Sequence, residues 1–186
     1  MCDFITGGRT EPCKDSVGGI DSVYFLDRDS IESFTIDSNG ILTDVVSVGV
    51  TDPTVFKYQV RGNSTYTENI QSSRENGTTV FEQVLELTFK KLTKEDHLDV
   101  KKLAFSRPYI IIVDNNENAF LAGAEFGIDV TGGTIVTGGA MADMSGYTLT
   151  FTGMEKAPAN FIEVANAGNT AVQNITAARF SIVPTP

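Results

Sequence analysis

The sequence contains one histidine, two cysteines and no tryptophan, and these shortages exclude several classes of function. A zinc site needs a cluster of Cys and His ligands, which three such residues cannot easily supply. A catalytic Ser-His-Asp or Cys-His set would have to use His97, and no nucleophile motif surrounds a serine or cysteine. We therefore expect no enzymatic activity, no catalytic residue, no cofactor and no metal.

The chain also lacks long apolar runs and a targeting segment. No run approaches the roughly 20 apolar residues that a membrane helix requires. The N-terminus, MCDFITGGRTEPCKDS, has no basic-then-apolar signal layout, so we expect synthesis and folding in the cytoplasm. In that compartment Cys2 and Cys13 are expected to be free thiols.

Basic residues are few, with 14 Lys and Arg against 24 Asp and Glu and a net charge of -10. This balance argues against an ordinary nucleic-acid binder, whose footprint is a basic patch. It is compatible with a surface past which DNA moves without sticking, because acidic groups repel phosphates. On composition alone, the simpler interpretation is that the charge keeps the protein soluble.

The stretch from Thr79 to Ala124 has the clearest pattern and begins with a long strand. Apolar and charged side chains alternate along it, as a half-buried strand requires. One face carries Phe81, Leu85, Leu87 and Phe89, and the other carries Glu82, Glu86 and Lys90.

A helix over about 94–106 follows, with Thr93 as its N-cap and Asp96 at the capping-box position. Its expected apolar stripe contains Leu98, Leu103, Ala104 and Phe105, and Pro108 ends it. The continuous apolar run Tyr109–Val113 predicts a strand that is covered on both faces. We expect the helix to cover the sheet, with one shared core formed by Phe81, Leu85, Leu87, Phe89, Leu98, Leu103, Ile110 and Ile112.

Shorter strands are expected on both sides of this stretch, over 21–26, 30–36, 42–48, 55–61, 134–137, 147–152 and 178–183. In the strand over 55–61, we expect Phe56, Tyr58 and Val60 to point inward. The pairs Gly132-Gly133 and Gly138-Gly139 are interpreted as β-turns that bracket a short strand. The chain thus divides into an N-terminal arm (1–19), a β-rich domain (20–155) and a C-terminal extension (156–186).

The polar segment 61–79 is either an extended hairpin or a long loop, and long loops in compact domains are usually functional or disordered. We expect it to be an assembly element that becomes ordered against a neighbouring subunit. Tyr66, Ile70 and Arg74 are its expected interface anchors, because aromatic and Arg side chains dominate interface energetics. In the N-terminal arm, Phe4 and Ile5 form an apolar patch suited to another surface.

One partial metal motif is present. Asp114, Asn116, Asn118 and Glu125 copy part of a calcium-loop spacing. The glycine that such a loop requires is replaced by Ala119, and the expected flanks are strands rather than helices. Ordinary turn chemistry is the favoured interpretation of these residues.

Three runs in this order, SSRENGTTVFEQVLELTFKKL, RPYIIIVDNNENAFLAGAEFGIDVTGG and DMSGYTLTFTGMEKAPANF, carry a resemblance to a known group. They resemble virion structural proteins of tailed bacteriophages, in particular tail-tube and related ring-forming tail proteins, Bacteroides-type phages included. The likeness spans about residues 17–162, is strongest from Ser72 to Phe161, and rests on element order rather than on a catalytic motif.

The resemblance implies a mainly β fold, a β-sandwich or rolled β-barrel with one flanking α-helix. It implies homo-oligomeric rings, expected to be hexameric, that stack with other tail proteins in the virion. Genomic DNA would pass through the ring channel without specific binding, and no membrane would be involved. The extension 163–186 departs from the simplest tube proteins, which leaves open a specialised ring, neck or hub position. A carbohydrate- or host-binding β-sandwich is the other alternative, against which the absence of Trp and of any aromatic-rich loop counts.

Overall fold

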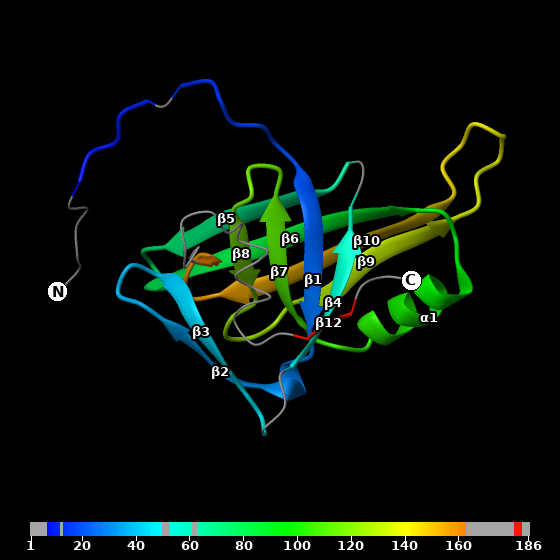
Figure 1. Ribbon diagram of the computed structural model, residues 1–186. Coiled ribbons are helices and arrows are strands. Elements are labelled where there is room, and N and C mark those ends of the chain that lie inside the picture. Colours follow the sequence, from blue (N-terminus) through cyan, green and yellow to red (C-terminus); the bar gives the residue numbers. More distant parts are fainter. Residues whose placement is uncertain (1–6, 12, 50–52, 61–62, 163–180, 184–186) are drawn as a thin grey trace.

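The computed structural model describes residues 7–11, 13–49, 53–60, 63–162 and 181–183. Within them the chain is mainly β, with two sheets that pack face to face and one α-helix at their side (Figure 1). The predicted fold class, a β-sandwich with one flanking helix, is confirmed.

The larger sheet, sheet A, has eight strands among the described residues, and the smaller, sheet B, has four. In spatial order sheet A contains β12 (Ser181–Val183), β4 (Thr54–Gln59), β1 (Ile20–Leu26), β7 (Tyr109–Asp114), β8 (Ala119–Ala122), β11 (Asn160–Ile162), β3 (Ile41–Ser47) and β2 (Ile31–Ile36). Sheet B contains β5 (Thr65–Ser73), β6 (Thr78–Lys90), β10 (Gly146–Glu155) and β9 (Asp129–Val136). A short 3-10 helix, η1 (Arg28–Ser30), joins β1 to β2.

Sheet A curls around a hydrophobic core of its own. Phe34 on β2 and Tyr109 on β7 are four strands apart in the sheet order, yet their ring centroids are 4.8 Å apart. Val55 on β4 belongs to the same buried cluster as Ile31 on β2. The two ends of the sheet therefore face each other across Tyr24, Leu26, Leu42, Val45, Ile111, Val113 and Leu121.

A second core lies between sheets A and B. Four residues predicted for it, Leu85, Leu87, Ile110 and Ile112, are at most 1% exposed. Alternate residues of β7 enter the two cores, so this strand is buried on both faces, as its continuous apolar run predicts.

The helix α1 (Lys94–Leu103) begins as predicted, with the backbone N–H of Asp96 donating to the Thr93 hydroxyl at 3.0 Å. It ends at Leu103 rather than near 106, and its predicted stripe is partly wrong. Leu98 is 53% exposed and Phe105 is 86% exposed, whereas Val100 packs against the second core together with Leu103. Successive helical residues are about 100° apart, so Leu98 points away from the side that carries Val100.

The helix packs at the side of the sandwich, next to Tyr58 and Phe89, rather than across a sheet face (Figure 1). None of the helices in the described ranges is long and apolar enough to cross a membrane.

The described part of the segment 61–79, residues 63–79, belongs to a hairpin, and the alternative of a long loop is wrong there. β5 pairs with β6 from Thr65 opposite Glu86 to Ser73 opposite Thr78. The 13-residue β6 offers a full row of backbone partners, so the polar segment is ordered by its own chain. Our premise that only a neighbouring subunit could order this segment is therefore wrong.

In β4 the expected inward position of Phe56 is wrong, because its side chain is 46% exposed. The adjacent Val55, on the other face, is fully buried in the core of the curled sheet. Phe56 lies on the same face as Tyr58 and Val60, which pack against the second core as expected, but that core does not extend far enough along β4 to cover Phe56.

The first described part of the expected C-terminal extension enters sheet A. β11 pairs antiparallel with β8 and parallel with β3, so it lies inside the sheet. Ser181–Val183, within the predicted last strand, form β12 parallel to β4. Residues 160–162 are thus part of the β-domain.

We predict that Leu87→Ala lowers the free energy of unfolding by about 2–5 kcal/mol, because Leu87 is fully buried between the sheets. Leu98→Ala is the matched control and should change it by less than about 0.5 kcal/mol, because Leu98 faces solvent. Urea denaturation measures both variants. Equal losses in the two would contradict the assignment of faces.

Candidate functional site

Sheet B has two long edge strands in the described part of the chain, β5 with nine residues and β9 with eight. An edge strand presents backbone N–H and C=O groups that can pair with another chain. Natural proteins usually keep such edges short or cover them. The two edges of sheet B are therefore the candidate contact surfaces of this protein.

On β5, the predicted anchor Ile70 is an exposed large apolar residue, with a relative exposure of 69%. It lies opposite Phe81 on the face of β5 that continues the core-lining face of β6. At Ile70, therefore, the apolar interior of the sandwich is exposed to solvent.

Tyr66, another predicted anchor, is half-buried and makes its contacts within its own chain. Its hydroxyl donates to the Glu68 carboxylate, which also accepts the backbone N–H of Ala159 at 2.8 Å. Burial, and then the bond to Glu68, raises the pKa of the Tyr66 phenol. Tyr66 thus supports the junction between β5 and the segment that leads into β11.

The remaining predicted anchors are not drawn together with Tyr66. Arg74 is exposed in the turn between β5 and β6. Phe4 and Ile5 lie outside the described residues.

On β9, Ile135 is an exposed isoleucine on the inner face of an edge strand, as Ile70 is on β5. The sequence pattern did not single it out. It lies opposite the buried Tyr147 of β10, on the core side of the sheet, and is 50% exposed. The alternation of Thr and Ile over 134–137 indicated a strand, but only the sheet order reveals that this strand is an edge.

The interpretation of Gly132-Gly133 as a turn is wrong, because both residues lie inside β9. A Cβ atom on Gly133 would come within 2.6 Å of the Thr148 carbonyl oxygen on the neighbouring strand. Glycine here permits close approach of β9 to β10 rather than a turn. Gly138, by contrast, has φ 76° and lies in the loop beyond the strand.

The outer face of sheet B, which points away from the core, is rich in threonine. Where the inner face buries Leu85, Leu149 and Phe151, most outer residues are polar and are partly or fully exposed. Hydroxyl contacts such as Thr131 to Thr152 at 2.9 Å cross it. Its residues are Thr65, Thr67, Asn69 and Gln71 on β5, Thr78, Val80, Glu82, Val84, Glu86, Thr88 and Lys90 on β6, Thr148, Thr150, Thr152 and Met154 on β10, and Thr134 on β9.

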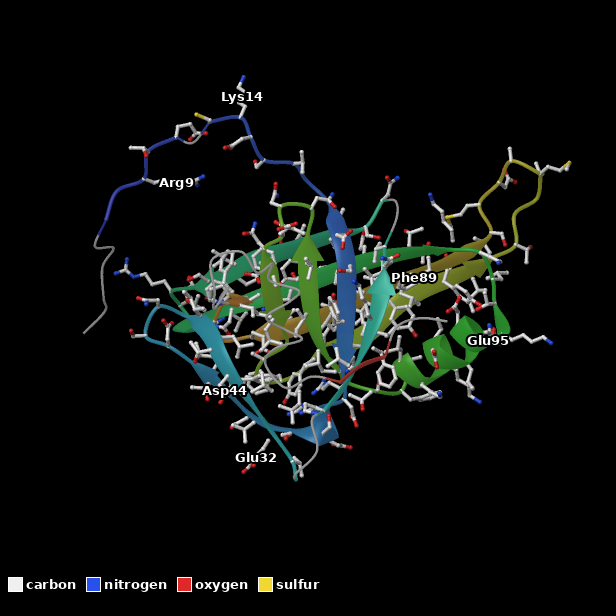
Figure 2. The ribbon with its side chains drawn as sticks, viewed as in Figure 1. Arg9, Lys14, Glu32, Asp44, Phe89 and Glu95 are labelled. Carbon is white, nitrogen blue, oxygen red and sulfur yellow. The ribbon has the colours of Figure 1, made fainter. Side chains whose placement is uncertain are left out.

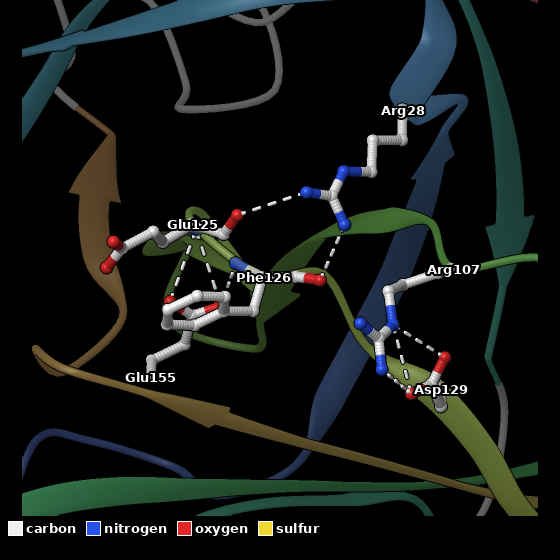
Figure 3. A network of polar contacts seen from close by, with 6 residues as sticks. All are labelled: Arg28, Arg107, Glu125, Phe126, Asp129 and Glu155. Atoms are coloured by element: carbon white, nitrogen blue, oxygen red, sulfur yellow. Dashed lines mark hydrogen bonds and ion pairs between the residues drawn. The ribbon is translucent and has the colours of Figure 1, made fainter.

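A buried carboxylate holds the connection that crosses from β8 in sheet A to β9 in sheet B. Glu155, 5% exposed, accepts the backbone N–H groups of Phe126 at 2.9 Å and Glu125 at 3.2 Å (Figure 3). From the opposite side the Arg28 guanidinium donates to the Phe126 carbonyl oxygen at 2.8 Å. The crossing is thereby fixed to both sheets.

An ion pair holds the start of the β9 edge. The Arg107 Nε donates to Asp129 Oδ1 at 2.9 Å, with further contacts between the same two groups (Figure 3). This bond to Arg107 holds the pKa of the Asp129 carboxyl below its usual range. The pair therefore fixes the position of the first residue of β9, at the edge of sheet B.

The residues considered above for catalysis or metal binding lie on the surface of the helix or take part in a turn. His97 lies exposed on α1. The Asp114 carboxylate accepts the backbone N–H groups of Asn116 and Asn118, both at 2.8 Å, and so closes the β7–β8 turn. Among the described residues, no group of three or more His, Cys, Asp or Glu side chains could hold a metal ion.

A groove of about 680 Å³ runs between α1 and the ends of the sheets. Tyr58 and Phe89 pack against each other in it, with ring centroids 5.5 Å apart. The Tyr58 hydroxyl donates to Asp99 on α1 at 3.0 Å. Burial, and then Asp99, raises the pKa of the Tyr58 phenol. The aromatic rings in this groove thus attach the helix to the sandwich.

The described residues of the N-terminal arm, 7–11 and 13–19, are all exposed. Its root is held by the Asn116 amide, which bonds the backbone N–H and C=O of Val17 at 2.9 and 2.7 Å. Arg9 and Lys14 lie well away from both sheets (Figure 2). The arm therefore extends into the space that a neighbouring molecule could occupy.

Glu155 generates a pH prediction. Burial raises the pKa of its carboxyl above the ordinary value of 4.5, so the folded protein binds this proton more tightly than the unfolded chain. The resulting stability is fully present below the unfolded-state pKa and is lost as the pH rises through the folded-state pKa. We expect the free energy of unfolding of the wild type, relative to that of Glu155→Gln, to fall as the pH rises above 4.5. Urea denaturation at a series of pH values measures it, and a difference that rises with pH would contradict the assignment.

Comparison with known proteins does not assign this chain to a family. No family model, no curated protein and no solved structure matches it.

Proposed function

We propose that this chain is a structural protein whose copies join edge to edge through sheet B into a closed ring. Following the resemblance to phage tail-tube proteins, the rings stack with other tail proteins into a tube, in a virion, through which DNA passes. The protein has no catalytic role in this proposal and is made in the host cytoplasm.

The observation that carries the proposal is the pair of exposed isoleucines at the two edges of sheet B. Ile70 on β5 and Ile135 on β9 both lie on the core side, and they are 69% and 50% exposed. Ile70 is level with Phe81 at one end of β6, whereas Ile135, through Tyr147, is level with Phe89 at the other end. Placed edge to edge with a shift along the strands that brings the two side chains together, β9 of one copy and β5 of the next would continue the apolar interior across the boundary. Covering both side chains would contribute on the order of 2 kcal/mol for each contact, beyond the backbone hydrogen bonds.

The strand directions support the same arrangement. Sheet B is antiparallel throughout and has four strands among the described residues, so its two edge strands run in opposite directions. When copies are related by rotation about an axis inclined to the strands, β9 meets the next copy's β5 antiparallel and shifted along the strands. The contact uses two different surfaces, which is the heterologous geometry that closes into rings.

In such a ring the outer face of sheet B would line the channel. That face carries threonines, the carboxylates Glu82 and Glu86, and one lysine, Lys90, at the end of β6. Few cations would contact phosphate groups there, and the net charge of -10 adds general repulsion. These features favour passage of DNA over retention.

A specialised ring at a neck or hub would use the same two edges, and the exposed arm suits contacts to a different neighbouring protein. The carbohydrate-binding alternative has less support, because the aromatic rings of the α1 groove pack against each other and against the helix.

Lysine at either edge position tests the proposal. Ile70→Lys and Ile135→Lys should each give a folded protein that sediments as a monomer, because a buried lysine at the joint is costly and edge lysines block strand pairing. Val48→Lys is the matched control, since Val48 is 58% exposed just after β3 in the other sheet. Circular dichroism confirms folding, and sedimentation velocity with electron microscopy measures assembly.

The wild type and Val48→Lys are expected to form rings. Rings formed equally well by both edge variants would contradict the edge-to-edge contact, and a wild type that stays monomeric at high concentration would contradict the proposed function.

A further inference from the structure

The loop between β9 and β10, residues 137–145, carries the most exposed large apolar side chain of the described residues. Met141 is fully exposed near its tip. The loop extends beyond the end of sheet B, where it is drawn in yellow in Figure 1. An isolated, fully exposed methionine on a projecting loop has no role in the core of its own subunit.

The loop is nevertheless closed by its own hydrogen bonds. The Asp143 carboxylate accepts the backbone N–H groups of Gly139 at 2.9 Å and Ala140 at 2.7 Å. The backbone N–H of Asp143 also donates to the Ala140 carbonyl oxygen at 3.1 Å. Met141 is therefore held out on a formed turn rather than on a slack segment, which lowers the entropy cost of docking it.

The opposite end of the sandwich presents aromatic surface. Phe161 on β11 is 52% exposed, and its ring centroid lies 4.6 Å from that of Phe120 on β8. The Phe120 ring in turn stacks on Tyr66 of sheet B at 6.5 Å. These three side chains form an aromatic row between the two sheets, and its outer member faces solvent.

The loop and the row lie at opposite ends of the molecule. The loop leaves sheet B at the end where Lys90 pairs with Gly146, whereas β11 lies beside β3 at the other end (Figure 1). In a stack of identical rings facing the same way, each end of a subunit meets the opposite end of a subunit in the next ring. The projecting methionine and the exposed aromatic row then approach each other.

We propose that Met141 of one copy docks against the Phe161–Phe120 surface of a copy in the adjacent ring, and that this contact stacks the rings. The inference rests on the proposed function and names the surfaces that join its rings. A methionine thioether is flexible and makes favourable contacts with aromatic rings, so it suits this surface. The edge isoleucines remain available for contacts within a ring, because neither belongs to this contact.

A photo-cross-linking amino acid at position 141 tests the contact directly in the assembled full chain. Mass spectrometry is expected to place the cross-link on residues around Phe161 and Phe120 of another copy. Cross-links within the same chain, or to a different surface of another copy, would overturn the proposal.

Met141→Asp gives a second readout by electron microscopy. It should leave rings intact but reduce tubes to single rings, because a carboxylate cannot dock on the aromatic surface without losing its hydration. Met154→Asp is the matched control, since Met154 is 53% exposed on the outer face of sheet B, and it should still form tubes. Normal tubes from Met141→Asp would overturn this contact alone, whereas a wild type without rings would overturn the proposed function as well.

Discussion

Burial of β7 on both faces is the constraint on which the rest of the structure depends. Ile110 and Ile112 enter the core between the sheets, while Ile111 and Val113 enter the core of the curled sheet A. A strand with two apolar faces must be covered twice, and one flat sheet cannot do this. Sheet A therefore curls over one face of β7, and sheet B with α1 covers the other.

Because sheet A covers one face of β7 and sheet B covers the other, sheet B itself has one covered face and two long edges. Side chains of sheet B bind the chain that crosses from sheet A, since Gln83 accepts the backbone N–H of Gly123, and Glu155 accepts those of Glu125 and Phe126. The sheet is therefore a fixed platform with a polar outer face. Its edges are β5 and β9, with Ile70 and Ile135 on the inner side, and these are the edges that the proposed ring would join.

Much of this fold could be predicted from sequence, because β6, α1 and β7 have strong local patterns and Thr93 caps the helix as expected. Leu98 and Phe56 were misplaced because their exposure depends on what covers each face, which periodicity does not reveal. Ile70 was singled out for its type, but its importance, like that of Ile135, comes from the sheet order. β9 pairs with its neighbour β10 and lies at an edge because β10 pairs on its other side with β6, which is far away in the chain. No local pattern encodes that second pairing.

Amide hydrogen exchange as a function of protein concentration tests the central claim most directly. If copies join through sheet B, amides in β5 (Thr65–Ser73) and β9 (Asp129–Val136) should gain protection together, at the concentration where rings appear. Amides of β2 (Ile31–Ile36), an edge strand of sheet A in the described residues, should keep their exchange rates. Rings that form without added protection in β5 and β9, or with protection in β2 instead, would contradict the account.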